Sequence, residues 1–233
     1  MELVLEAESD KIPFFKQYFS VVILAANIIV FIWQLLDPAG QMHIEYAFVP
    51  AEFFAGQNLW NLLASMFMHG DIVHITMNMW FFIVITDNCE HAMGHIYYLI
   101  VYLISGLCGS LLHALSTVII PGEIIPGVTL ADIPSLGASG AIFGLMGVYL
   151  ILYPKNKFYL PSTTGLSMRK VSAGYFILTY FIAEMSYAIY SLTDPFGMGS
   201  TAHFAHVGGF IAGLVGAGIF KAVKGSSYMK KKP

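Results

Sequence analysis

The chain has 233 residues, of which 57% are hydrophobic and only 11% are charged. A soluble domain usually carries about 25% charged residues, so these few charges cannot cover the surface of a soluble globule of this size. The net charge of −3 gives no reason to expect a nucleic-acid binder, and two cysteines cannot build a disulfide scaffold. The composition excludes a soluble enzyme, a disordered protein and a small secreted domain, and it indicates a polytopic membrane protein.

Six apolar runs approach the length of about 20 residues that a helix needs to cross a bilayer. In chain order, the predicted spans are residues 18–36, 72–86, 95–118, 136–153, 171–192 and 203–223. The second run is short, but an apolar stretch at 59–68 precedes it, and we expect that stretch to be a loop segment that dips into the membrane interface. The predicted fold is an all-α bundle of six transmembrane helices at residues 17–222, between short tails at 1–16 and 223–233.

The basic residues predict the orientation of this bundle. All 11 Lys and Arg residues lie before the first span, between the fourth and fifth spans, or at and beyond the end of the sixth. The loops at 37–71, 119–135 and 193–202 contain none. Because cytoplasmic segments are enriched in Lys and Arg, we expect a multi-pass protein of the cell membrane with both termini in the cytoplasm. The turn at 87–94 is expected on the same side.

Polar groups inside a bilayer are costly, so each one within a span is a candidate for function. The candidates are His74, Asn78, Ser139, Glu184, His203 and His206. The second, fourth and sixth spans all run inward, and Ser139 follows Pro134 by five residues, which is about 8 Å along a helix. His74, Ser139 and His206 are therefore expected at one depth, in the outer third of the membrane, which indicates a site assembled between facing helices.

Glycines predict close contact between the fourth and sixth spans. Gly140 and Gly144 are four residues apart in one span, and Gly209 and Gly213 have the same spacing in the other. Small residues at this spacing allow two helix backbones to approach closely. A hydrogen bond between Ser139 and a histidine on the sixth span requires such an approach.

A serine hydroxyl is a weak nucleophile until a base takes its proton. His206 is the predicted base for Ser139, and no carboxylate stands where the spacing would let it orient His206, which indicates a Ser–His dyad. Phe143 lies four residues after Ser139, so we expect its ring beside that of His206. Glu184, the one formal charge well inside a run, is interpreted as a structural group that hydrogen-bonds a neighbouring helix.

The tetrahedral intermediate of acyl transfer needs hydrogen-bond donors for its oxyanion. His74 and Asn78 are four residues apart, so they share one helix face. Ser139 lies near a helix start, where backbone N–H groups have no intrahelical partner. The predicted oxyanion hole consists of His74, Asn78 and the backbone N–H of Ser139.

At these residues the sequence resembles the rhomboid family of intramembrane serine proteases. The matching segments are 137–140 for Gly-x-Ser-Gly, 74–78 for His-x-x-x-Asn and 205–209 for Ala-His-x-x-Gly, together with Trp60 and residues 90–94. The resemblance covers about residues 15–222. One departure is Asn61, because the family often has Arg after this Trp.

The resemblance implies cleavage of transmembrane protein substrates near the outer face of the membrane, with lipids as the other partners. It implies that Ser139 is the nucleophile, that His206 is the general base and acid, and that His74 and Asn78 help to bind the oxyanion. No cofactor or metal is expected. In this family, the fifth span and the loop above it are thought to gate substrate entry.

Two alternatives remain open at this stage. His91 and His95 have a metal-binding spacing of four residues, so a His-based membrane transporter is conceivable, although this pair is expected on the cytoplasmic side and the other candidate histidines near the outside. The second alternative is a non-catalytic rhomboid-like adaptor. His203 is a candidate for substrate binding, and His69 is interpreted as a residue that holds loop structure.

Overall fold

The computed structural model describes residues 5–6, 13, 16–119, 123–161, 167–194 and 202–229, and of 123–125 and 225–229 it describes the backbone alone. The predicted tails at 1–16 and 223–233 therefore lie largely outside the described residues. So do Lys11 and the three consecutive lysines at 230–232, which support the predicted orientation.

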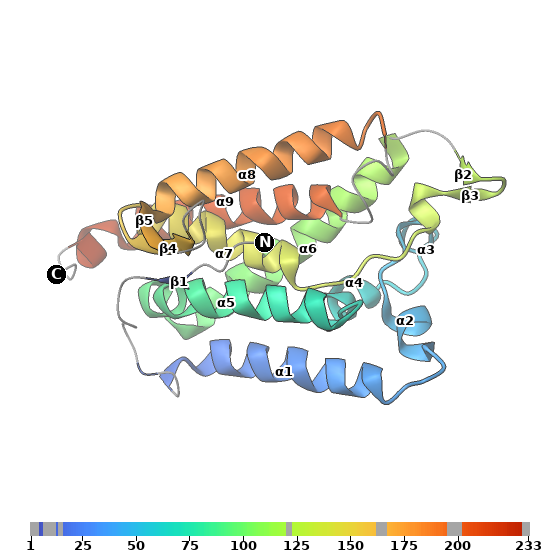
Figure 1. The fold of residues 1–233 in the computed structure, drawn as a ribbon, viewed down its shortest axis with the longest axis horizontal. Helices are drawn as coiled ribbons and strands as arrows, with labels where there is room; N and C mark the ends of the chain where they lie inside the picture. The colour runs from blue at the N-terminus through green and yellow to red at the C-terminus, as the bar shows by residue number, and fades with distance from the viewer. Residues whose placement is uncertain are drawn as a thin grey trace.

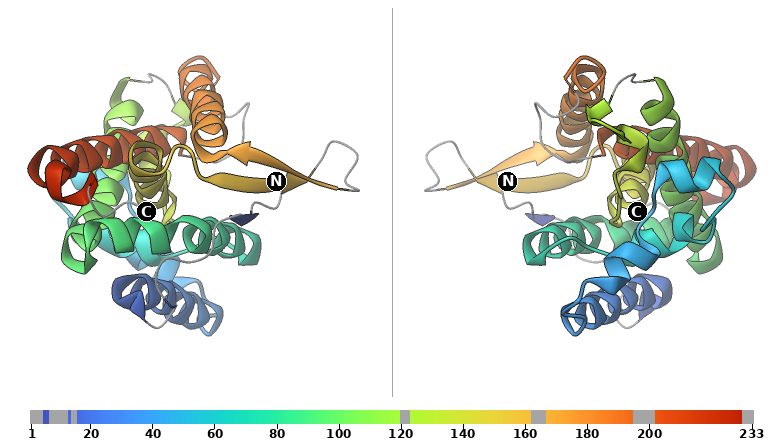
Figure 2. Two further views of the ribbon diagram at one scale, coloured as in Figure 1. Left: turned by 90° about the vertical axis from the view of Figure 1, so that its left-hand side faces the viewer. Right: turned by 90° about the vertical axis from the view of Figure 1, so that its right-hand side faces the viewer.

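Six long helices form the bundle, as predicted (Figure 1). They are α1 (Tyr18–Leu35), α5 (Ile72–Met93), α6 (His95–Ile119), α7 (Ser139–Leu152), α8 (Ala173–Tyr190) and α9 (His203–Met229). Among the described residues, α1, α5, α6 and α9 are long and apolar enough to cross a membrane, α7 is a shorter apolar helix, and α8 falls outside both groups. Helix α7 lies between the others, with α1 and α8 at opposite edges (Figure 2).

The central helix α7 begins later than expected. The predicted span at 136–153 starts at Ser139, because Ser135 pairs with Phe48 in an antiparallel bridge and Gly137 adopts φ 128°. The depth estimate that assumed a helix from Pro134 was therefore wrong. The 14 residues of α7 rise by roughly 21 Å at 1.5 Å each, which is less than the ~30 Å hydrocarbon core of a bilayer. A helix this short leaves its first turn within the bundle.

Helix α5 is longer than predicted, because it continues through the expected turn at 87–94 and ends at Met93 before Gly94. The last turns of α5 carry polar side chains that bond other parts of the protein. Glu90, which is fully buried, accepts hydrogen bonds from the backbone N of Phe19 (3.0 Å) and Ser20 (2.9 Å) and contacts His95 Nδ1 (2.5 Å). Glu184 is therefore not the only buried carboxylate.

A small antiparallel sheet, which was not predicted, joins α7 to α8. Strands β4 (Lys157–Pro161) and β5 (Met168–Ser172) pair as a hairpin, and β1 (Leu5–Glu6) adds to β4. Phe158 and Leu160 alternate with more exposed residues along β4, the two-residue period of a half-buried strand. The fifth span therefore begins at Ala173 rather than at 171. A second hairpin, β2 (Glu123–Ile125) and β3 (Val128–Thr129), precedes the one-turn η3 (Leu130–Asp132).

The loop after α1 folds into four short helical segments at the end of the bundle where α5, α7 and α9 begin (Figure 1). They are α2 (Gln41–Tyr46), α3 (Pro50–Phe54), α4 (Asn61–Ala64) and η2 (Ser65–Phe67). Asn61 of α4 links this segment to the end of α2, because its Nδ2 donates to the carbonyl oxygens of Glu45 (2.8 Å) and Ala47 (3.1 Å). The neighbouring Trp60 is 60% exposed, as suits the predicted contact of this loop with the membrane interface.

Helices α7 and α9 touch backbone to backbone, as their glycines predicted. A Cβ atom on Gly209 would lie 1.9 Å from the carbonyl oxygen of Gly140, and one on Gly213 would lie 1.8 Å from that of Gly144. Both distances are far below a van der Waals contact, so no larger residue fits at either position. This contact sets the distance between Ser139 on α7 and His206 on α9.

Candidate active site

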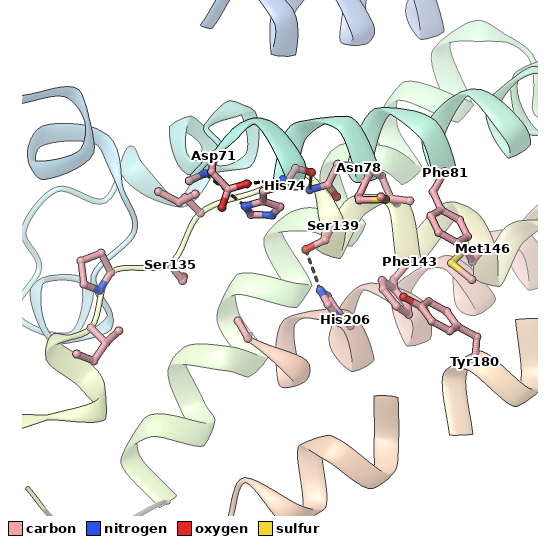
Figure 3. Close-up of a pocket in the computed structure, with 17 residues that line it drawn as sticks. Asp71, His74, Asn78, Phe81, Ser135, Ser139, Phe143, Met146, Tyr180 and His206 are labelled. Carbon is pink, nitrogen blue, oxygen red and sulfur yellow. Dashed lines mark hydrogen bonds between the residues drawn. The ribbon is translucent and has the colours of Figure 1, made fainter. Parts of the chain in front are cut away.

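Ser139 and His206 face one another across the contact between α7 and α9 (Figure 3). Ser139 Oγ lies 2.9 Å from His206 Nε2, a hydrogen-bond distance. Ser139 is the first residue of α7, and His206 lies in the first turn of α9 and is buried. The two residues that were expected at one depth are in direct contact.

Ser139 lies at the start of α7, where backbone N–H groups precede the first helical hydrogen bond. The first helical hydrogen bond of α7 runs from Ile142 N to the carbonyl oxygen of Ala138, so the N–H groups of residues 139–141 precede it. No side chain caps this end of the helix. The predicted N–H donor at Ser139 is therefore at a helix start, where the helix dipole also favours negative charge.

His74 and Asn78 lie on one face of α5 and line the same cavity as Ser139 (Figure 3). Asp71 caps α5, its Oδ1 accepting a hydrogen bond from His74 N (2.8 Å), and the backbone N–H of Gly70 donates to His74 Nδ1 (3.3 Å). Because Nδ1 accepts, the ring proton of neutral His74 is on Nε2. A Cβ on Gly137 would lie 2.9 Å from that Nε2, so this N–H borders the turn that leads into Ser139.

A column of stacked aromatic rings packs against one face of the His206 ring. Phe143 stacks on it at 4.3 Å between centroids and 9° between planes, as predicted. Tyr180 of α8 stacks on the other side of Phe143 at 5.6 Å, and Phe81 of α5 stacks on Tyr180 at 5.8 Å. This column joins α5, α7 and α8 beside His206 (Figure 3).

The prediction that no carboxylate orients His206 is wrong. Glu184 Oε2 lies 2.8 Å from His206 Nδ1 and 2.8 Å from His203 Nδ1, and all three side chains are buried. The sequence spacing identified Glu184 as a polar residue in a span but could not give the rotation of α8 about its axis. In the structure, α8 turns this residue towards the start of α9.

A cavity of about 490 Å³ opens beside Ser139. His74, Asn78, Ser139 and His206 form its polar part, and Met77, Phe81, Ile142 and Met146 are among the apolar side chains that line the rest. A site with a few convergent polar groups in an apolar cavity is typical of small-molecule or peptide binding. The cavity is wide enough to admit an apolar side chain next to the hydroxyl.

The described residues contain one group that could hold a metal ion, formed by Glu184, His203 and His206 with their donor atoms within 4.8 Å of one another. Carboxylate and imidazole are ligands that zinc accepts. The Nδ1 atoms of both histidines already hydrogen-bond Glu184 Oε2, so the arrangement is accounted for without an ion. His95 instead contacts Glu90 at the end of α5, away from this group.

His69 lies in the loop before α5, as predicted, and it is fully buried. Gln34 of α1 holds its backbone from both sides, since Gln34 Nε2 donates to the carbonyl oxygen of His69 (3.0 Å) and Gln34 Oε1 accepts from its N–H (3.0 Å). Burial, together with the nearby His74, lowers the pKa of His69 to about 3. His69 is therefore neutral at physiological pH and anchors the loop that leads into α5.

The fold and the site together define a class: a polytopic helical membrane protein with a serine and a histidine in contact at the start of a short central helix. A family model described as Rhomboid domain matches residues 56–222. The chain belongs to the rhomboid family.

Individual relatives agree with this assignment. The chain is 32% identical to RHOMBOID-like protein 6, mitochondrial, of Arabidopsis thaliana over 159 residues, which cover 68% of this chain and 43% of that protein. It is 24% identical to Rhomboid protease GluP of Bacillus subtilis (strain 168) over 172 residues, 74% of this chain and 28% of that protein. It is also 27% identical to Inactive RHOMBOID-like protein 8 of A. thaliana over 154 residues, 66% and 36% of the two chains. The chain thus spans less than half the length of these relatives.

Proposed function

We propose that this protein is an intramembrane serine endopeptidase that hydrolyses peptide bonds in or near the transmembrane segments of membrane-protein substrates. The observation that carries the proposal is the 2.9 Å contact between Ser139 Oγ and His206 Nε2 in a bundle of rhomboid type. Ser139 is the nucleophile, and His206 is the general base and then the general acid.

The proposed reaction uses groups of the protein itself, the substrate and water. His206 Nε2 takes the proton of Ser139 Oγ as the oxygen attacks the scissile carbonyl carbon. The N–H of Ser139, Asn78 Nδ2 and His74 Nε2 stabilise the oxyanion of the tetrahedral intermediate. His206 then protonates the leaving amine, and water repeats the sequence to release the acyl fragment from Ser139.

The surroundings of the site support a substrate that is itself a membrane segment. Ser139 begins a helix too short to cross the bilayer, and the adjacent cavity is lined largely by apolar side chains. The distribution of Lys and Arg supports a cell-membrane protein with cytoplasmic termini and a site that opens towards the extracellular side.

The test is cleavage of a purified single-span substrate in liposomes. Wild-type protein should cleave it, and Ser139→Ala and His206→Ala should each abolish cleavage while the thermal unfolding midpoint stays close to that of the wild type. The matched control is Ser186→Ala, which removes an exposed hydroxyl on α8 that bonds only its own helix at Ile182. Full activity in Ser139→Ala would contradict the mechanism.

The name of one relative, Inactive RHOMBOID-like protein 8, suggests the alternative of a non-catalytic adaptor. Ser139 and His206 are both present in this chain and in hydrogen-bond contact, which favours the enzyme. A folded wild-type protein that binds single-span substrates but cleaves none of them would favour the adaptor instead.

A further inference from the structure

Glu184 determines which ring nitrogen of neutral His206 carries the proton. Its Oε2 lies 2.8 Å from His206 Nδ1, and an ionised carboxylate can only accept hydrogen bonds. The ring proton of neutral His206 is therefore on Nδ1, and the lone pair of Nε2 faces Ser139 Oγ at 2.9 Å. This is the tautomer that a general base for a serine requires.

We propose that Glu184 is the positioning residue of a Ser139–His206–Glu184 triad, and that His203 holds the carboxylate in place. The proposal rests on the proposed function and adds to it a third member that the sequence pattern did not predict. Glu184 orients the imidazole and stabilises the imidazolium that forms when Ser139 loses its proton. It does not itself exchange a proton with the substrate.

His203 completes the arrangement around the carboxylate. Its Nδ1 lies 2.8 Å from the same Oε2 that contacts His206, and it precedes His206 by three residues, so both rings project from one face of α9. A buried carboxylate with too few donors is costly, and the second N–H offsets part of that cost. The ring of Tyr187 lies 5.3 Å from that of His203 and limits its movement.

Helix α8, which carries Glu184, also acts on His206 through a stack of aromatic rings. Tyr180 precedes Glu184 by one turn of α8 and stacks on Phe143, which in turn stacks on His206. Tyr180, Glu184 and Tyr187 have the i, i+4, i+7 spacing of a single helix face. The position of α8 therefore fixes both the contact of Glu184 with the edge of the His206 ring and the stacking of Phe143 on its face.

The central experiment replaces Glu184 by Gln, which keeps the shape but removes the charge. Two quantities are measured in liposomes: kcat and KM on the single-span substrate, and the rate at which a fluorophosphonate labels Ser139. We expect kcat to fall by up to about 10⁴-fold, the loss seen when a serine protease loses its orienting carboxylate, while KM changes little. The labelling rate should fall in parallel. His203→Ala should cause a smaller loss, because His206 keeps its carboxylate.

The matched control is Glu90→Gln, which removes a buried carboxylate that contacts His95 Nδ1 (2.5 Å) at the far end of α5. If Glu184 had only a structural role, the two variants would behave alike, with a lower unfolding midpoint but unchanged kcat and labelling rate per folded molecule. That result for folded Glu184→Gln would overturn the proposal.

Two further outcomes separate this proposal from others. If the wild type cleaves, Ser139→Ala does not, and Glu184→Gln is as fast as the wild type, the triad is wrong and the proposed function stands. If the wild type neither cleaves nor reacts with the fluorophosphonate, the proposed function fails and the triad fails with it. Loss of wild-type activity on chelation, with recovery on adding zinc, would assign Glu184, His203 and His206 to a metal instead.

Discussion

At the scale of single residues, His206 is constrained on three sides. Ser139 lies at its Nε2, Glu184 at its Nδ1, and Phe143 against its face. Ser139 and Phe143 lie on α7 and Glu184 lies on α8, so no single helix holds the ring alone. Replacement of one neighbour should therefore change the rate of the reaction more than it changes the fold.

The oxyanion donors give a prediction at this scale. Asn78→Ala removes one side-chain donor from the cavity, and loss of one such donor costs about 10²–10³-fold in kcat in other enzymes. We expect a loss of that order, with KM nearly unchanged, in the liposome cleavage assay. Thr76→Ala is the control on the same helix, because its exposed hydroxyl bonds only the carbonyl oxygen of Ile72. Equal activity of the two variants would remove Asn78 from the oxyanion hole.

At the scale of elements, the contact between α7 and α9 positions the reacting pair. Gly209 and Gly213 lie against the carbonyl oxygens of α7, with no room for a methyl group. A shift of either helix would lengthen the distance from Ser139 to His206. Packing at these glycines and activity should therefore change together.

Gly209→Ala tests this coupling. The added Cβ would lie 1.9 Å from the Gly140 oxygen, so the helices must separate, at about 1–3 kcal/mol for an overpacked site. We expect a lower unfolding midpoint and a slower cleavage rate per folded molecule. Gly218→Ala is the matched control on α9, because a Cβ there meets nothing within 4 Å; it should be neutral or slightly stabilising. Full activity in Gly209→Ala would show that the reacting pair tolerates helix separation.

The small sheet contains a carboxyl group, that of Glu6, whose contribution to stability depends on pH. Glu6 of β1 accepts hydrogen bonds from Tyr149 and from Asn88 Nδ2 (2.7 Å), and burial, with Asp87 nearby, raises its pKa from 4.5 to about 7. The folded protein therefore holds a proton that the unfolded chain releases between pH 4.5 and 7. The contribution of Glu6 to stability accordingly falls as the pH rises through this window.

Glu6→Gln should remove this dependence. The variant should match the wild type near pH 5 and be more stable near pH 8, by at most about 3 kcal/mol, because Gln needs no proton to stay neutral. Thermal unfolding of both proteins across this pH range in one detergent measures the difference. If the difference in stability between the two proteins were the same at pH 5 and at pH 8, Glu6 would already be ionised in the folded protein.

At the scale of the whole molecule, six helices of unequal length bring a polar site into a mostly apolar bundle. Because α7 is short, its first turn and Ser139 lie beside a cavity rather than at the end of a full-length span. The shape of the bundle, more than any single residue, gives the proposed reaction a place within the membrane.

Metal removal gives a prediction at this scale. The proposed reaction uses only protein side chains, so a strong chelator should leave the cleavage rate of the purified protein unchanged. The measurement is the initial rate in liposomes before and after dialysis against the chelator. A loss of activity that zinc reverses would instead give the group around Glu184 a metal-binding role.

The site was largely predictable from sequence because rare polar residues in apolar spans are conspicuous. Ser139 and His206 were predicted to meet, and they do so at 2.9 Å. The partner of His206 was missed because hydropathy locates a span along the chain but not its rotation. The spacing of Tyr180, Glu184 and Tyr187 on one helix face was the available signal.

Element boundaries were harder to predict than the spans themselves. Helix α5 continues past its apolar run because Glu90 is paired in the interior, a tertiary effect that local hydropathy does not contain. Helix α7 starts late because Ser135 bonds a distant loop at Phe48. The strands around Phe158 are too short for their alternation to be clear beside long helical spans.

The most direct measurement for the central claim is mass spectrometry of the protein after reaction with a fluorophosphonate. We expect a single adduct, located on Ser139 by peptide mapping, and no adduct in folded Ser139→Ala or His206→Ala. Absence of an adduct from folded wild-type protein, or an adduct on another serine with Ser139 unmodified, would contradict the account.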